Sequence, residues 1–367
     1  MPLLQQRIMM WLLTAFVAAV ALSFAVSGTA KADSLVEVER AKDRETTLEQ
    51  RLEKALPTFD HKDYVTLGVE NDLFGDGRDR YYTSGVRLSW FKVGADMPEF
   101  TEQIDDILPT FDIDEKTSVF FSLGQNLYAP QDITIEANQD DERPWAAWLY
   151  GSMGLLTVTD DHLDEVELSL GVVGPYALGK QTQRLIHKNV DSPDPRGWKN
   201  QLKNEPGVIL SWERRFPSYL SFEAADLWLD VAPSFGVALG NVYTHASAGV
   251  SFQIGPEYQR WQDMPMRVRP SMPGTGFFVP TSWSRVGWSI FGGAEARAVG
   301  RNIFIDGNSF RDSHSVDKEH FVYDLNGGVS LTYGPMRTSY TVVRRSKEFK
   351  GQDEASIFGG LSFSVQF

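Results

Sequence analysis

The sequence predicts an all-β fold: a transmembrane antiparallel β-barrel of about 12 strands, with a short N-terminal helical extension and one loop that contains a helix. Three observations support this prediction. Residues 355–367 alternate apolar side chains with small or polar ones and end on Phe367, which is typical of the closing strand of an outer-membrane barrel. The N-terminus has the features of a secretory signal. Alternating runs long enough to cross a bilayer occupy most of the remaining chain.

Residues 1–32 have the features of a signal peptide. Arg7 gives a positive start, 9–26 are apolar, and Ala30-Lys31-Ala32 forms a small-x-small cleavage site. The alternative is a single transmembrane anchor, because the apolar run is nearly long enough to span a bilayer. No other stretch is as long, so a membrane protein with this sequence must cross with strands. We expect a mature protein that begins near Asp33, in the outer membrane of a Gram-negative bacterium.

The composition agrees with that compartment. The chain has no cysteine, so neither disulfides nor thiolate metal sites hold the fold. Its net charge is -14, which argues against nucleic acid as a partner and suits loops that hold divalent cations beside anionic lipid. The mean hydropathy of -0.27 does not exclude a barrel, since only every second residue of a strand faces lipid.

The mature chain divides into two parts. Residues 33–61 are rich in charge, with Leu48, Leu52 and Leu56 four residues apart, and we expect a short amphipathic helix ahead of the barrel. Residues 62–367 contain the alternating runs of the barrel, although a soluble β-sandwich also alternates. The predicted strands are Lys62–Asp72, Tyr81–Lys92, Ser118–Gln125, Trp145–Thr157, Leu163–Val173, Gly207–Phe216, Leu220–Val231, Ser234–Tyr243, either Ser247–Ile254 or Arg285–Ala298, Phe321–Tyr333, Thr338–Arg345 and Ala355–Phe367.

The first two predicted strands bring a set of oxygen ligands together. Alternation places Asp72 and Thr83 on the lumen face, and the short Gly- and Asp-rich connection makes these strands hairpin neighbours. Asn71, Asp72 and Thr83 offer hard oxygen atoms, which suit Ca²⁺. The alternative is that Asn71-Asp72 belongs to an ordinary turn and Thr83 to an ordinary strand.

The segment 174–206 is a long loop with a helical stretch of its own. Gln183 and His187 are four residues apart, so a helix would present both on one face. Histidine is the side chain best suited to accept a proton near neutral pH. The alternative is a solvated loop histidine that bonds a carboxylate.

Five blocks of sequence, in this order, resemble the lipid A 3-O-deacylase family of outer-membrane barrels. The blocks are Glu70-Asn-Asp-Leu-Phe74, Asp79-Arg-Tyr-Tyr-Thr-Ser-Gly85, Gly124-Gln-Asn-Leu-Tyr-Ala-Pro130, Gly171-Val-Val-Gly-Pro175 with Gln183 and His187, and Gly197-Trp-x-x-Gln201. The resemblance implies a 12-stranded barrel with a Ca²⁺-dependent site near the outer rim that removes an ester-linked acyl chain from lipid A.

Carried over by position, the resemblance implies that Asn71, Asp72, Thr83, Gln183 and His187 form the site, the first three also holding Ca²⁺. The family has acidic and aromatic side chains six to eight residues after its histidine, where this chain has Pro193 and Pro195. Asp191 or Asp194 could substitute for the acid. A family lysine from the loop after the third strand has no counterpart, since 131–142 contain none.

These groups predict hydrolysis of an ester by water. His187, oriented by Gln183, would remove a proton from water, and Ca²⁺ near Asp72 would stabilise the oxyanion. A serine mechanism is disfavoured because the chain has no Gly-x-Ser-x-Gly, and alternation directs Ser84 toward lipid. The expected partners are lipopolysaccharide and the outer membrane, with the protein acting as a monomer. Two alternatives stay open: a Ca²⁺-dependent outer-membrane phospholipase, and a non-catalytic barrel or pore.

Overall fold

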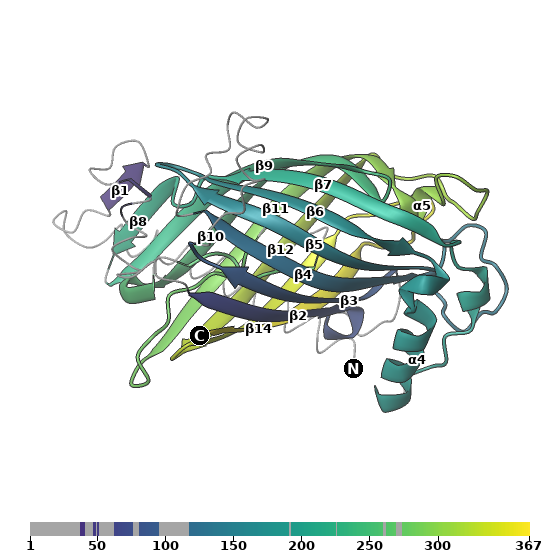
Figure 1. The fold of residues 1–367 in the computed structure, drawn as a ribbon, viewed down its shortest axis with the longest axis horizontal. Helices are drawn as coiled ribbons and strands as arrows, with labels where there is room; N and C mark the ends of the chain where they lie inside the picture. The colour runs from purple at the N-terminus through teal and green to yellow at the C-terminus, as the bar shows by residue number, and fades with distance from the viewer. Residues whose placement is uncertain are drawn as a thin grey trace, which may run out of the picture.

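The chain folds into a closed antiparallel barrel (Figure 1). The computed structural model describes residues 37–40, 47–48, 50, 62–75, 81–94, 117–190, 192–224, 226–259, 262–268 and 274–367. The 12 barrel strands are β2 (Asp63–Asn71), β3 (Tyr81–Lys92), β4 (Ser118–Ala129), β5 (Ala146–Val158), β6 (Leu163–Val173), β7 (Glu205–Arg215), β9 (Leu227–Gly240), β10 (Tyr243–Pro256), β11 (Val286–Asn302), β12 (Phe321–Tyr333), β13 (Met336–Arg345) and β14 (Ser356–Gln366).

Two pairings close the ring. The last strand, β14, pairs with β2, and Gly359 lies opposite Asn71. On the other side β7 pairs with β9, and Arg215 lies opposite Ser234. Closure pairs the backbone groups that an open sheet edge would leave bare in hydrocarbon, which is the condition for crossing a bilayer with strands.

The two ends of the barrel carry different elements. Asp63 and Phe367 exchange backbone hydrogen bonds of 2.9 and 3.2 Å at the end that we call the lower rim. The opposite end, the upper rim, carries α4 (Gly179–Val190) and α5 (Ile303–Asp306), as Figure 1 shows. None of the helices in the described part of the chain is long and apolar enough to cross a membrane.

Alternation along the strands separates a lumen face from an outer face. On β2, Thr66 and Glu70 are buried in the lumen, whereas Leu67 is exposed on the outside. Leu123 and Leu170 are 59% and 53% exposed on the outer wall. An apolar outer wall around a polar interior is the arrangement that a barrel needs in a bilayer.

Most of the predicted strands are confirmed. Three of them, β3, β6 and β12, have the predicted bounds. The sequence offered Ser247–Ile254 and Arg285–Ala298 as alternatives, and both belong to strands of the barrel, β10 and β11.

The prediction was wrong for residues 220–243. Instead of two strands separated by a turn near Pro233, the chain forms the short β8 (Leu220–Ala224) and the long β9, which runs through Pro233. Before Pro233 β9 pairs with β8, and after it β9 pairs with β7. The ladder therefore changes partner at the residue that has no N–H to donate, which explains why proline is tolerated inside this strand.

The residues before the barrel agree with the predicted extension only in part. β1 (Glu37–Arg40) is a strand that pairs with β8, so this stretch is not helical as expected. Leu48 is helical and packs in a cluster near the lower rim. The predicted signal peptide, 1–32, and most of the predicted helix lie outside the described residues.

Packed aromatic rings close the lumen beneath the upper rim. Phe304 of α5 stacks on Tyr128 with ring centroids 4.1 Å apart, and the hydroxyl groups of Tyr128 and Tyr243 lie 2.8 Å apart. Tyr82 packs edge-on against Phe358, with centroids 4.9 Å apart. Rings from β3, β4, β10 and β14 thus meet α5 across the barrel.

A segment between β10 and β11 fills the lower lumen. We call its described residues, 262–268 and 274–281, the lumen insert. Tyr64 donates a hydrogen bond of 2.9 Å to the carbonyl of Phe278, and Arg337 donates one of 2.9 Å to the carbonyl of Asp263. Arg267 forms an ion pair with Glu70 of β2. The sequence did not predict this insert, which occupies the space that an open pore would need.

Candidate active site

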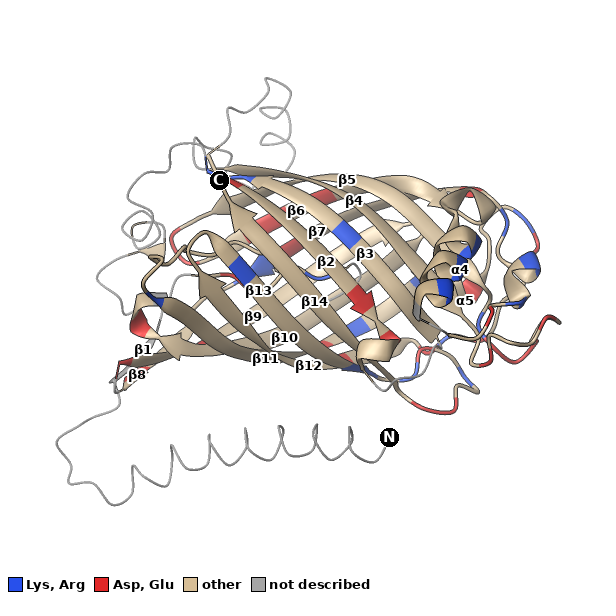
Figure 2. Cartoon of the chain, turned by 90° about the horizontal axis from the view of Figure 1, so that it is seen from below, with Lys and Arg blue, Asp and Glu red and all other residues tan. Residues whose placement is uncertain are grey.

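The helix that carries Gln183 and His187 lies against the outer wall of the barrel. α4 follows the short η4 (Pro175–Ala177), packs against β4 and β5, and stands at the upper rim in Figure 2. Beneath this loop is a hydrophobic cluster that includes outward-facing residues of the wall. Its buried members are Leu127, Ala129, Ile133, Trp145, Ala147, Ala177 and Trp198.

Two glycines permit the close approach of this loop to the wall. Gly174 has a φ of 101°, and a Cβ there would lie 2.6 Å from the backbone carbonyl carbon of Lys203. A Cβ on Gly179 would lie 2.5 Å from the Cβ of Ala147 and 2.5 Å from the ring of Trp198. A larger residue at Gly179 would push the first turn of α4 away from the barrel.

Asn71 and Asp72 lie where β2 ends and the chain folds over the outer wall. Asn71 caps η2 (Asp72–Phe74), because its Oδ1 accepts a hydrogen bond of 2.8 Å from the backbone N–H of Leu73. η2 lies against β14, and Tyr340 of the neighbouring β13 donates a hydrogen bond of 2.8 Å to the carbonyl of Phe74. Asp72 is buried in this turn, with 3% of its surface exposed.

Thr83 is the extra residue of a β-bulge. The register between β3 and β4 shifts between Tyr82 and Ser84, so the alternation that predicted Thr83 on the lumen face is broken at this residue. Ser84 pairs with Asn71, and Tyr82 joins the lumen cluster. Thr83 is 2% exposed, and its Oγ1 has no hydrogen-bond partner in the described part of the chain. Asp72 also lies beyond the end of its strand, so alternation does not determine its direction either.

Gln183 is held by an indole. The Nε1–H of Trp198 donates a hydrogen bond of 2.7 Å to Oε1 of Gln183, and both residues are almost fully buried. Because the indole nitrogen can only donate, this contact determines which end of the amide is oxygen and leaves the NH₂ group on the other side. The Trp198 ring is fixed in turn against Trp145, with ring centroids 5.0 Å apart.

His187 is held by the main chain. Its Nδ1 lies 2.6 Å from the carbonyl oxygen of Pro193, and the side chain is buried. A carbonyl only accepts, so Nδ1 carries a proton, and in the neutral form of the ring Nε2 is the basic nitrogen. The resemblance places an acidic side chain in this part of the family's site. In this chain the backbone carbonyl of Pro193 supplies the oxygen that orients the imidazole. The prediction from the sequence considered only side chains and did not include this contact.

Asp191 and Asp194 were the two acids considered as substitutes for the acid of the family. Asp194 forms a 3.5 Å ion pair with Arg184, and Asp191 lies outside the described residues. A second contact secures the loop: Lys199 lies 2.7 Å from Glu136, and this ammonium group lowers the pKa of the Glu136 carboxyl. The loop after β4 and the loop that carries α4 are thereby joined.

The predicted site residues form two groups at the upper rim. Asn71, Asp72 and Thr83 lie at the junction of β2 and β3, and Gln183 and His187 lie on α4 over β4 and β5. The strands between them are direct neighbours, since β3 pairs with β4. Asn71, on the outward-facing side of β2, and the helix that carries Gln183 and His187 therefore belong to strands at most a few positions apart at the same end of the barrel.

The oxygen set is suited to a weakly bound hard cation. The described residues include no group of three or more His, Cys, Asp and Glu side chains that could hold a metal ion. A cation here would rest on one carboxylate, from Asp72, with amide, hydroxyl and backbone oxygens. The buried Oγ1 of Thr83 is an oxygen without a partner in this region, and Ca²⁺ accepts such mixed oxygen ligands.

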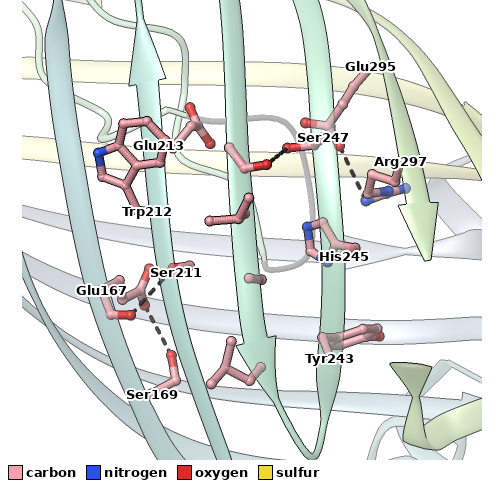
Figure 3. A pocket seen from close by; sticks show the side chains of 14 residues that line it. Glu167, Ser169, Ser211, Trp212, Glu213, Tyr243, His245, Ser247, Glu295 and Arg297 are labelled. Atoms are coloured by element: carbon pink, nitrogen blue, oxygen red, sulfur yellow. Dashed lines mark hydrogen bonds and ion pairs between the residues drawn. The ribbon is translucent and has the colours of Figure 1, made fainter. Parts of the chain in front are cut away.

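A second group of polar residues lines a cavity inside the lumen (Figure 3). His245, Glu213 and Glu295 face it together with Arg297, and its volume is about 50 Å³. That volume holds a few water molecules and is too small for an acyl chain. The aromatic cluster below the upper rim and the lumen insert lie between this cavity and the two ends of the barrel, so its histidine is poorly placed to meet a lipid.

Comparisons with known proteins agree with this architecture. The model of a family described as "Outer membrane protein LpxR" matches residues 16–367. Among solved structures, LpxR from Salmonella typhimurium superposes with a TM-score of 0.66 at 16% sequence identity, covering 82% of this chain and 99% of that one. The β domain of the Bordetella autotransporter BrkA gives a TM-score of 0.40 at 9% identity, covering 84% and 98%. The search of curated proteins found no match.

Proposed function

Because the chain belongs to the family of the outer membrane protein LpxR, we propose that it is a hydrolase that removes the 3-O-linked acyl chain of lipid A. The observation that carries this proposal is His187: a buried imidazole with Nδ1 bonded to a backbone carbonyl, on the wall-facing side of α4. With Nδ1 donating to this carbonyl, Nε2 would be the nitrogen that acts as the base.

The location of the site favours a lipid substrate. It lies on the outer wall, where the barrel exposes its apolar surface, and the lumen is filled at both ends. A lipid ester in the outer leaflet could reach the upper rim by lateral diffusion, whereas a solute would have no route through the barrel. This arrangement favours an enzyme that acts on lipid over the alternative of a pore.

The proposed reaction is general-base hydrolysis. His187 takes a proton from water at Nε2 while the water oxygen bonds to the ester carbonyl carbon. The bond between that carbon and the sugar oxygen then breaks, and His187 returns the proton to the sugar oxygen, giving a free fatty acid and a 3-hydroxyl group. A positioned base typically contributes a factor on the order of 10²–10⁴ to the rate.

The other predicted residues would bind and stabilise charge. Trp198 holds Oε1 of Gln183 and so fixes the orientation of the amide, whose N–H side would stabilise the oxygen that becomes negative. Asn71, Asp72 and Thr83 would hold Ca²⁺, and the ion when bound would lower the energy of the developing oxyanion. A serine nucleophile is not required.

A purified-enzyme assay tests the proposal. Lipid A and a glycerophospholipid are incubated separately with the protein in the presence of Ca²⁺, and the masses of the products are measured by mass spectrometry. We expect loss of one acyl chain from lipid A alone, and a rate at least about 100-fold lower for His187→Ala or after Ca²⁺ chelation. Cleavage of the phospholipid alone would instead support the phospholipase alternative, and unchanged rates in both perturbations would exclude the proposed chemistry.

A further inference from the structure

The loop that carries α4 is positively charged on an acidic protein. The chain has a net charge of -14, yet residues 174–204 contain six Lys and Arg against two Asp, a net charge of +4. The other long loops of the upper rim are negative: 130–145 contain five acids and one Arg, and 303–320 contain four acids and two bases. Positive charge is therefore concentrated beside the proposed site.

Three of these cations form a row along α4. Lys180, Arg184 and Lys188 are spaced four residues apart, so they lie on one side of the helix over a length of about 12 Å. All three side chains are exposed, and Figure 2 shows their charge on α4. We call them the cationic stripe. Among the described residues only Arg184 has an ion-pair partner, the exposed Asp194 at 3.5 Å.

The stripe lies next to the proposed catalytic face. Arg184 and Lys188 each follow a site residue, Gln183 and His187, so the stripe is rotated from the site by about 100° around the helix. On the far side of the stripe is Leu185, which is 65% exposed. The helix thus presents a buried polar face, a cationic flank and an apolar outer face in succession.

We propose that the cationic stripe binds the phosphate groups of lipid A and so positions its sugar ester at His187; this inference rests on the function proposed above. Ammonium and guanidinium groups form charge-assisted hydrogen bonds with phosphate oxygens. An acidic protein repels an anionic lipid in general, so a local reversal of charge is needed where that lipid must dock. The stripe contributes to affinity, and the chemistry remains with His187.

Equilibrium binding to a non-cleaving form of the full mature protein tests this inference. The detergent-solubilised His187→Ala protein is titrated with lipid A and with lipid A stripped of its phosphates, both in mixed micelles. We expect Lys180→Gln, Arg184→Gln and Lys188→Gln, added together, to raise the Kd for phosphorylated lipid A by about 10- to 100-fold and to leave the Kd for the stripped lipid unchanged. High salt should remove most of this difference.

Two control proteins keep the comparison specific. Lys180→Arg, Arg184→Lys and Lys188→Arg preserve the charges and should preserve the affinity. Arg311→Gln, Lys347→Gln and Lys350→Gln remove three exposed charges elsewhere on the upper rim and should also bind normally. An unchanged Kd in the stripe variant, or an equal loss for both lipids, would overturn the inference. Binding is measured here without turnover, so the two proposals can fail separately. If the wild-type protein releases no acyl chain and still binds lipid A through its phosphates, the proposed function is refuted and the phosphate-binding role of the cationic stripe is supported.

Discussion

At the scale of single residues, the proposed function depends on two buried polar side chains of α4, Gln183 and His187. Gln183 and His187 are buried, while Leu185 of the same helix is exposed. A helix that only covered the wall would be expected to do the reverse and bury its leucine. The inverted pattern is the one that the proposed catalytic role of Gln183 and His187 needs.

Thr83→Val separates a catalytic role of Thr83 from a structural one. The change keeps the shape of the side chain and removes Oγ1, a buried oxygen with no hydrogen-bond partner among the described residues. We expect thermal stability to stay the same or rise, because an unsatisfied buried polar group costs free energy. We expect the affinity for Ca²⁺ and the rate of acyl release to fall about 10- to 100-fold. A loss of stability with normal turnover would contradict this role.

Trp198→Phe tests whether the indole N–H orients Gln183. Phenylalanine keeps an aromatic ring against Trp145 and loses the donor to Oε1 of Gln183. We expect kcat to fall about tenfold with little change in KM, since the amide would be free to turn, and stability to fall by about 1 kcal/mol. Steady-state kinetics and a thermal melt measure both quantities. A change confined to KM would assign Trp198 to lipid binding instead.

Some features of the candidate site could be predicted from the sequence, and others could not. The spacing of Gln183 and His187 predicted that both lie on one helix, and this prediction is confirmed. The carbonyl of Pro193 could not be predicted as a partner of His187, because every residue type has a backbone oxygen. The sequence showed only that Pro193 stands where the family has a different side chain. Alternation failed at Thr83 for a related reason: a bulge adds one residue without altering the composition of the strand.

At the scale of elements, the bounds of β3, β6 and β12 could be predicted to the residue, although β3 contains the bulge at Thr83. β9 could not, because a proline usually ends a strand, and only the three-dimensional change of partner from β8 to β7 makes it acceptable there. The lumen insert was missed because its Pro- and Met-rich sequence has neither strand nor helix periodicity.

The lumen insert depends on one carboxylate. Asp263 lies 2.5 Å from Arg215 and accepts hydrogen bonds of 2.7 and 2.6 Å from the backbone and hydroxyl of Thr275. Burial raises the pKa of Asp263, but the charge of Arg215 and these hydrogen bonds outweigh burial and hold the pKa below its usual value. Its contribution to stability is therefore complete above about pH 4 and is lost as the pH falls through the lowered pKa.

Asp263→Asn should loosen the insert at neutral pH. We expect hydrogen exchange of the amides in 274–278 to quicken about 10- to 100-fold, since a charged hydrogen bond contributes about 1.5–3 kcal/mol. After correction for the slower intrinsic exchange at low pH, acidification should lower the protection factors of these amides in the wild-type protein and have less effect on the variant. Exchange that is equally slow in both proteins at neutral pH would show that the aromatic contacts of Phe278 suffice to hold the insert.

At the scale of the whole molecule, the barrel serves as a wall and not as a conduit. Its interior is packed with rings and ion pairs, including Arg87 with Glu167 at 3.0 Å and Arg345 with Asp324 at 2.8 Å. Its upper outer surface carries the oxygen cluster, the imidazole and the cationic stripe. A rigid interior holds the strands that carry these residues in fixed positions. A proposed catalytic site at the edge of a barrel requires such fixed positions.

The most direct test of the central claim is the mass of lipid A from Gram-negative cells that express this protein. We expect cells with the wild-type protein to contain lipid A that has lost one 3-O-linked acyl chain and has a free hydroxyl group in its place. Cells with equal amounts of folded His187→Ala protein should keep the full mass. Lipid A of identical mass in cells with and without the wild-type protein, or the lighter species with the His187→Ala variant, would contradict it.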